Sequence, residues 1–194
     1  MFKAIQLCIL IVSLFRIVLK DRMKRKALLK KLLLLLIICC NIGCDQISKS
    51  IARKELGSHE QVKFLYNRLT LIKVENSGAF LSFGDELPQA VKFVLLSLLP
   101  LMFLAYGLYC LLTKPGLDNV YAIGLCFVIG GGIGNLFDRM LYGAVTDFLH
   151  LDLGVFQTGI FNLADVSIMI GMGVLLFQIY QQQNGQKQLK STAE

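Results

Sequence analysis

Four long apolar runs constrain this chain more than any other feature. They cover residues 32–43, 91–112, 120–141 and 161–180. The first span continues through residues 44–49, so that each span is close to the ~20 residues that a helix needs to cross a bilayer. With 55% hydrophobic and only 17% charged residues, the composition is too apolar for an ordinary soluble domain. The chain is therefore predicted to be one polytopic membrane unit with four transmembrane helices.

The amino-terminal segment does not fit this plan. Residues 5–19 are apolar but interrupted by Arg16, and the stretch is shorter than a spanning helix. A second methionine, Met23, opens a basic segment that directly precedes the first apolar run. We hypothesise that Met23 is the functional start and interpret residues 1–22 as an N-terminal extension outside the structural unit.

The distribution of positive charge predicts the topology. Seven of the 20 Lys and Arg residues lie between Lys20 and Lys31, and such clusters stay on the cytoplasmic side of a membrane. Four crossings then define a membrane domain over residues 23–182, followed by a polar cytoplasmic tail over residues 183–194. The net charge of +7 is thus a topology signal, and we expect no nucleic-acid partner.

A secretory signal peptide also combines basic residues with a following apolar run. Asn41-Ile42-Gly43-Cys44 even has some likeness to a lipoprotein processing box. This interpretation is disfavoured, because Asn41 stands where the box has an aliphatic residue and because three more apolar runs follow.

The first outward loop contains strand-like sequence. Residues 62–66 and 69–74 flank Asn67-Arg68 and are rich in β-branched, aromatic and other apolar residues, which predicts a hairpin lying on the membrane surface. The segment Asn76-Ser77-Gly78-Ala79-Phe80-Leu81 is typical of a turn that leads into the next apolar run.

Two carboxylates stand beside apolar runs that leave little room for charge, so each must be compensated or used. Asp147 follows the outer end of the third run, and Asp165 lies four residues into the fourth, about 6 Å of helix rise below its outer end. Both can reach one plane in the outer leaflet. Carboxylates held close share a proton, so one can take a proton from water while the other donates to a carbonyl oxygen. The pair predicts peptide hydrolysis of the aspartic type.

Polar residues on the third and fourth runs fit such a site. Asn135, Asp138 and Arg139 lie at helical spacing along one face, and Asn162 lies three residues before Asp165. They can orient the substrate and the two acids. The alternatives are a headgroup anchor for Arg139 and an interhelical hydrogen bond for Asn135.

Asp45 and Lys49 form a further charged pair at the end of the first run. They are four residues apart with the acid first, which is the favourable order for a pair on one helix face. Two interpretations stay open: an ion pair at the water boundary, or a part of the site.

We expect neither a metal nor a nucleotide. The six cysteines all lie in apolar stretches, and His59 and His150 are the two histidines of the chain, which is a poor supply for a zinc site. The glycines of residues 130–134 lack the strand-turn-helix context of a dinucleotide loop. Small residues at this spacing instead let membrane helices pack closely, so no cofactor is predicted.

Five short motifs follow one another along the chain. They are Asp45-Gln46-Ile47-Ser48-Lys49, Asn76-Ser77-Gly78-Ala79, Gly134-Asn135-Leu136-Phe137-Asp138-Arg139, Gly143-Ala144-Val145-Thr146-Asp147-Phe148 and Phe161-Asn162-Leu163-Ala164-Asp165. Together they resemble the motifs of the prokaryotic lipoprotein signal peptidases, also called signal peptidase II, from Met23 to Tyr180. Two features depart from that pattern: Ala79-Phe80-Leu81 stands where the family commonly has two alanines and a phenylalanine, and residues 1–22 have no counterpart.

The resemblance implies a membrane all-α fold of four transmembrane helices with a small β-rich cradle on the outer face. It also implies an aspartic endopeptidase of the bacterial cytoplasmic membrane, with Asp147 and Asp165 as its dyad, that cleaves prolipoproteins before a diacylglyceryl-modified cysteine. The positions that the family uses around substrate and dyad are matched by Asp45, Lys49, Asn76, Asn135, Arg139 and Asn162. The implied partners are the prolipoprotein and membrane lipid, no cofactor is implied, and we expect a monomer.

Two other function classes remain. A small channel or transporter also uses buried acids, but it would place them at mid-bilayer and show internal repeats, which this sequence lacks. A serine-lysine peptidase built on Ser48 or Ser50 with Lys49 would need another geometry, because neighbouring residues on a helix do not face each other.

Overall fold

The computed structural model describes residues 2–57, 60–78, 86–114 and 116–191. Contacts within the chain separate two compact units, Met1–Leu36 and Ile37–Glu194. The first unit is helical from Phe2 onward, as the first part of α1 (Phe2–Glu55). All the residues of the candidate site belong to the second unit.

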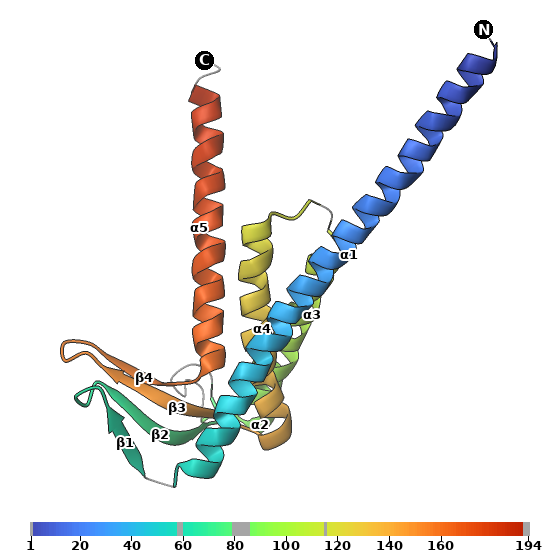
Figure 1. The fold of residues 1–194 in the computed structure, drawn as a ribbon. Coiled ribbons are helices and arrows are strands. Elements are labelled where there is room, and N and C mark those ends of the chain that lie inside the picture. The colour runs from blue at the N-terminus through green and yellow to red at the C-terminus, as the bar shows by residue number, and fades with distance from the viewer. Residues whose placement is uncertain (1, 58–59, 79–85, 115, 192–194) are drawn as a thin grey trace. The chain divides into compact units, whose positions relative to one another are not determined.

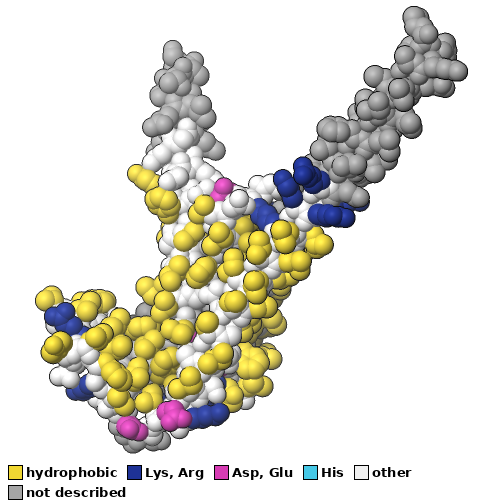
Figure 2. Space-filling model, viewed as in Figure 1, with side chains coloured by type: hydrophobic (Ala, Val, Ile, Leu, Met, Phe, Trp, Pro, Cys, Tyr) yellow, Lys and Arg dark blue, Asp and Glu magenta, His cyan; other side chains and the backbone are white. Residues whose placement is uncertain are grey.

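Four helical segments are long and apolar enough to span a membrane: Lys24–Glu55, Gln89–Thr113, Asn119–Tyr142 and Leu163–Gly185. They belong to α1, to the consecutive helices α2 (Gln89–Phe93), η2 (Val94–Leu98) and α3 (Leu99–Thr113), to α4 (Asn119–Tyr142) and to α5 (Leu163–Ser191). Large apolar side chains such as Met102, Phe103 and Phe177 are exposed on them, and Figure 2 shows hydrophobic side chains spread over the helices. The predicted architecture of four membrane spans is confirmed.

Local chemistry explains where these helices widen, begin and end. Pro100 has no N–H to donate, and the turn just before α3, η2, is a π-helix, the wider turn that often occurs where the regular bonding of a helix is interrupted. The Asp118 side chain caps α4 by accepting hydrogen bonds from two N–H groups of the first turn, at 2.8 and 3.1 Å. Gly143 ends α4 with a φ of 77°, a conformation that favours glycine.

The helices α4 and α5 pack through glycines. A side chain added at Gly131 would meet the backbone carbonyl oxygen of Ala164, and one added at Gly171 would lie 2.6 Å from the carbonyl oxygen of Gly124. Such a close approach of two backbones requires small residues. The glycines of residues 130–134 therefore lie inside α4 and serve helix packing, as expected.

A four-stranded antiparallel sheet extends from one end of α4 and α5, as Figure 1 shows. Its strands are β1 (Gln61–Phe64), β2 (Leu69–Asn76), β3 (Val145–Asp152) and β4 (Gln157–Phe161), in that order. The predicted hairpin β1–β2 is confirmed. The sheet also contains a second hairpin, β3–β4, which the sequence analysis does not single out; a register shift between His150 and Asp152 interrupts its ladder.

One face of the sheet packs on the end of α1. Ala52 and Leu56 of α1 are buried against Phe148 of β3, and the residues around them are Val62, Leu71, Leu149 and Leu163. This apolar contact joins the sheet to the helices and leaves the opposite face of the sheet for polar side chains.

The start of α5 differs from the expected one. Phe161 is the last residue of β4, and α5 begins at Leu163, so Asp165 lies in the first turn of the helix and not four residues into it. The helix also continues to Ser191, into the segment expected to be a polar tail.

Candidate active site

The two candidate carboxylates reach one cavity from different elements. Asp147 lies near the start of β3, and Asp165 lies in the first turn of α5. Both line a cavity of about 320 Å³, together with Asn135 and Arg139 of α4. The fold therefore brings the two acids into the same space.

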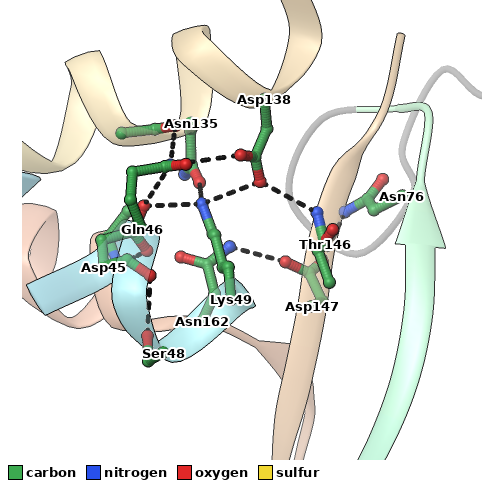
Figure 3. A network of polar contacts seen from close by, with 12 residues as sticks. Asp45, Gln46, Ser48, Lys49, Asn76, Asn135, Asp138, Thr146, Asp147 and Asn162 are labelled. Atoms are coloured by element: carbon green, nitrogen blue, oxygen red, sulfur yellow. Dashed lines mark hydrogen bonds and ion pairs between the residues drawn. The ribbon is translucent and has the colours of Figure 1, made fainter. Parts of the chain in front are cut away.

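Asp147 is buried and held by two amides. The residue is only 4% exposed to solvent. Asn76 Nδ2 donates to its Oδ2 at 2.9 Å, and Asn162 Nδ2 donates to its Oδ1 at 2.6 Å (Figure 3). Burial raises the pKa of Asp147 to about 6, although the two hydrogen bonds lower it; the charge of Asp165 raises it further. A carboxyl with this pKa can exchange a proton near neutral pH.

Asn162 also holds Asp165, through the start of α5. Asn162 Oδ1 accepts a hydrogen bond from the Asp165 N–H at 3.0 Å, and Asp165 Oδ2 accepts one from the Asn162 N–H at 3.1 Å. This reciprocal arrangement is a capping box, and a negative charge is favoured at a helix N-terminus. The other carboxylate oxygen, Asp165 Oδ1, accepts a hydrogen bond from Asn135 Nδ2 at 2.8 Å. Asn162 thus contacts both acids.

A buried ion cluster lies behind the two acids, formed by Asp45 and Lys49 of α1 and Asp138 of α4. Lys49 Nζ lies 2.8 Å from Asp45 Oδ2 and 3.2 Å from Asp138 Oδ2, and all three side chains are at most 1% exposed. Lys49 also donates to Asn135 Oδ1 at 2.8 Å, so the cluster reaches Asp165 through one amide. Asp45 and Lys49 thus form the expected ion pair, and it is buried and connected to a candidate acid.

Four residues that the sequence analysis does not single out extend this cluster: Gln46, Arg53, Glu75 and Thr146. Gln46 Nε2 donates to Asp138 Oδ1 at 3.1 Å. Gln46 belongs to the first motif, and this position in the sequence already indicates that it is part of the site. Arg53 lies four residues after Lys49 on the same helix face, and this spacing was also visible in the sequence.

Arg53 connects α1 to the strand that carries Asp147. Its Nη1 donates to Thr146 Oγ1 at 2.9 Å and lies 3.6 Å from Asp138 Oδ1. The Thr146 hydroxyl in turn donates to the Glu75 carboxylate at 3.2 Å, and the Thr146 N–H donates to Asp138 Oδ2 at 3.2 Å. Three elements, α1, α4 and β2, therefore hold the residue directly before Asp147.

Arg139 holds the segment that follows β2. Its Nη2 donates to the carbonyl oxygen of Gly78 at 3.1 Å, and Asn76 Oδ1 accepts a hydrogen bond from the Gly78 N–H at 3.0 Å. Arg139 thus contacts the protein next to the acids and is more than a headgroup anchor. The segment Ala79-Phe80-Leu81, where the sequence departs from the family pattern, lies outside the described residues.

Two other chemistries have little support in this arrangement. The Lys49 ammonium contacts three partners, and the Ser48 hydroxyl donates to the carbonyl oxygen of Asp45 at 2.8 Å, so neither is arranged as a serine-lysine pair. In the described parts of the chain, no group of three or more His, Cys, Asp or Glu residues is placed to hold a metal ion.

Comparisons with known proteins identify the family. The model of a family described as "Signal peptidase (SPase) II" matches residues 37–181, more than half of the chain. The chain belongs to the signal peptidase II family. The match includes every candidate residue from Asp45 to Asp165, so the resemblance found in the five motifs is confirmed.

Curated relatives of this signal peptidase II family member carry the name "Lipoprotein signal peptidase". The protein of Aquifex aeolicus is 34% identical over 137 residues, which are 70% of this chain and 78% of the relative. The protein of Desulforapulum autotrophicum is 34% identical over 142 residues, 71% of this chain and 85% of the relative. The protein of Streptococcus pyogenes is 31% identical over 143 residues, 74% of this chain and 90% of the relative.

Solved structures support the fold. One described as a bacterial membrane enzyme superposes with a TM-score of 0.70 at 21% identity, over 78% of this chain and 90% of that chain. A second structure with the same description has a TM-score of 0.66 at 22% identity, over 75% of this chain and 91% of that chain. The combination of four membrane helices and a small sheet is therefore shared with experimental structures.

Proposed function

We propose that this multi-pass membrane protein is an aspartic endopeptidase that removes signal peptides from prolipoproteins, by cleaving just before a diacylglyceryl-modified cysteine. Membership of the signal peptidase II family supports the reaction and the substrate class. One observation carries the choice of residues: Asp147 and Asp165 line one cavity and are both hydrogen-bonded to Asn162.

The two acids hydrolyse the peptide bond by sharing one proton. The ionised carboxylate takes a proton from the attacking water, and the protonated carboxyl donates to the carbonyl oxygen of the scissile bond. The tetrahedral intermediate then collapses with cleavage of its C–N bond: the first acid gives its proton to the leaving amine nitrogen, and the second takes one back from a hydroxyl of the intermediate. Each of the four carboxyl oxygens accepts a hydrogen bond from an asparagine. These bonds fix the orientation of both carboxyls before the substrate arrives. Such positioning of the reacting groups lowers the activation barrier.

We place the acids at the outer leaflet and both termini in the cytoplasm. The basic cluster before the first span, together with Lys114 between the second and third spans, supports this orientation. A cysteine that carries a diacylglyceryl group is held at the headgroup plane by its acyl chains. The scissile bond then lies at the depth of Asp147, next to the end of α4. We expect the enzyme to act as a monomer on its lipidated substrate.

A cleavage assay with the purified full chain tests this function. A synthetic prolipoprotein segment with a diacylglyceryl-modified cysteine should be cut once in detergent, and mass spectrometry should place the cut directly before that cysteine. The same segment without the lipid is the matched control and should be a much poorer substrate. A failure to cut the lipidated segment, or a cut at another bond, would contradict the proposal.

A further inference from the structure

A second cavity lies beside the candidate active site, on the face of the sheet opposite the contact with α1. Its volume is about 580 Å³. Alternate residues of two strands line it, Gln61 and Lys63 of β1 and Thr70 and Ile72 of β2, and residues 158–160 of β4 complete the wall. A period of two along β1 and β2 is that of a single sheet face. We call this cavity the sheet groove.

The sheet groove meets the active-site cavity at one of the two acids. Asn76, Asp147 and Ile160 line both cavities, so Asp147 stands at the junction between them. The two chain segments that flank a scissile bond leave it in different directions. An endopeptidase that cuts at Asp147 therefore has one cavity available for each segment.

The two cavities differ in chemistry. The wall of the active-site cavity includes apolar side chains of the spanning helices, namely Leu96, Pro100, Ile168 and Met169. These suit a signal peptide that reaches the acids from within the membrane. Besides the apolar Ile72, Val74 and Ile160, the sheet groove carries the ionisable side chains of Lys63, His150 and Asp152 and the hydroxyls of Thr70 and Thr158. This mixed lining suits a polypeptide with polar side chains.

We propose that the sheet groove binds the extended polypeptide segment that follows the modified cysteine and stays with the mature lipoprotein. This inference rests on the proposed function and adds a second substrate site to it. Contacts made far from the reacting bond help to position that bond. The rate of cleavage then depends on the residues after the cysteine, although none of them reacts.

The first arm of the test varies the length of the substrate. Two lipidated segments share the signal peptide and the modified cysteine, but one ends at that cysteine as an amide and the other continues into a short polar tail. Both contain the scissile bond, so both report on the proposed function. The tailed substrate should show a kcat/KM about tenfold higher.

The second arm reverses a charge in the groove. Lys63→Glu should lower kcat/KM for a substrate with an acidic tail by about two- to fivefold, the range expected for exposed charge pairs. For a substrate with a basic tail, the same variant should raise kcat/KM. Cleavage of the cysteine amide, which has no tail, gives the reference rate of each variant against which the effect of tail charge is measured. The matched control is Lys73→Glu, the same charge change on β2 at a residue that does not line the groove.

The outcomes separate the two proposals. If both substrates are cut equally fast, or if Lys63→Glu and Lys73→Glu respond alike to tail charge, the groove does not bind the mature segment, whereas the proposed function stands. An effect of Lys63→Glu that follows charges on the signal-peptide side would likewise overturn the assignment. If neither substrate is cut, the proposed function fails and this inference falls with it.

Discussion

At the scale of single residues, asparagine assembles this site, because an amide both donates and accepts hydrogen bonds. Asn135 accepts from Lys49 and donates to Asp165, so it joins a buried cation to one acid. Asn162 donates to Asp147 and accepts from the first turn of α5. An aspartate at either position would instead add a negative charge next to the pair. The amides thus orient two acids without adding to their repulsion.

We predict that Asp147→Asn and Asp165→Asn each lower kcat by about 100- to 10,000-fold, because asparagine keeps the shape but does not exchange the proton that each turnover requires. The double variant should be scarcely worse than either single one, since residues that act as a unit are not additive. Asp118→Asn is the control with the same charge change, and asparagine caps a helix as well as aspartate does. Turnover near the wild-type rate in either single variant would rule out the aspartic pair.

The pH dependence follows from the surroundings of Asp147. Burial favours its neutral form and raises its pKa to about 6, so the pair keeps its shared proton below that pH and loses it as the pH rises. The rate should therefore fall on the alkaline side. Asn76→Ala removes a donor that stabilises the ionised form, so it should move this fall to higher pH. Profiles of kcat/KM against pH for both proteins test this, and a shift to lower pH would contradict it.

Much of the residue-level site was predictable, but some of it was not. The motifs mark Asp45, Lys49 and Asn135, because acids and amides are costly beside apolar runs and stand out there. Glu75 lies in none of the five motifs, and Thr146 lies in the fourth motif only as an uncharged neighbour of Asp147. They meet because β2 pairs with β3 in one register, and a register between strands far apart in sequence is not visible in either strand alone.

At the scale of elements, helices were easier to predict than strands. A spanning helix needs a long apolar run that is complete in itself, so four runs predict four spans. A strand of five to eight residues, such as β4 or β3, has few positions from which to read alternation. The helix α5 starts two residues after the first residue of its apolar run, because Asn162 and Asp165 form the cap at the start of the helix.

The contact of β3 with α1 should depend on the hydroxyl of Thr146. Thr146→Val leaves the donor of Arg53 and the carboxylate of Glu75 without this partner, which costs on the order of 1–3 kcal/mol. We expect lower thermal stability and a lower kcat, because Asp147 is the next residue. Thr146→Ser keeps the hydroxyl and is the control that should retain both. Equal behaviour of the two variants would mean that the hydroxyl does not position the strand.

The packing of α4 on α5 gives a prediction with an internal control. Gly131→Ala places a methyl group against the backbone of Ala164, and overpacking of this kind costs about 1–3 kcal/mol. Because Ala164 directly precedes Asp165, activity should fall together with the melting temperature in detergent. A side chain at Gly173 meets nothing within 4 Å, so Gly173→Ala should leave both unchanged. A Gly131→Ala protein as stable and active as the Gly173→Ala protein would contradict the close packing.

At the scale of the whole molecule, membrane topology predicted that the acids meet. Asp147 and Asp165 lie near the end of the third span and the start of the fourth, and two crossings joined by a loop bring these two ends to the same side. The sheet was only partly predictable, because its two hairpins come from loops that are far apart in the chain. The cavity at the junction of sheet and helices therefore emerges only from the folded chain.

The last prediction concerns the amino-terminal segment. The family match begins at residue 37, and the candidate site begins at Asp45. The segment Met23–Lys31 already supplies the basic flank that orients the first span. A variant that begins at Met23 should therefore insert in the same orientation and cleave substrate within about twofold of the full chain, a difference smaller than 0.5 kcal/mol.

Membrane-fraction yield, the side reached by a reporter fused to the carboxyl terminus, and kcat/KM together check this outcome. The matched control begins at Met23 but replaces Lys24, Arg25 and Lys26 with glutamine, which removes most of the basic flank and should lower correct insertion. If residues 1–22 themselves crossed the membrane, the later loops would keep their sides and the amino terminus would move outward. Loss of insertion or cleavage in the variant that begins at Met23 would then show that the extension is a working part of the enzyme.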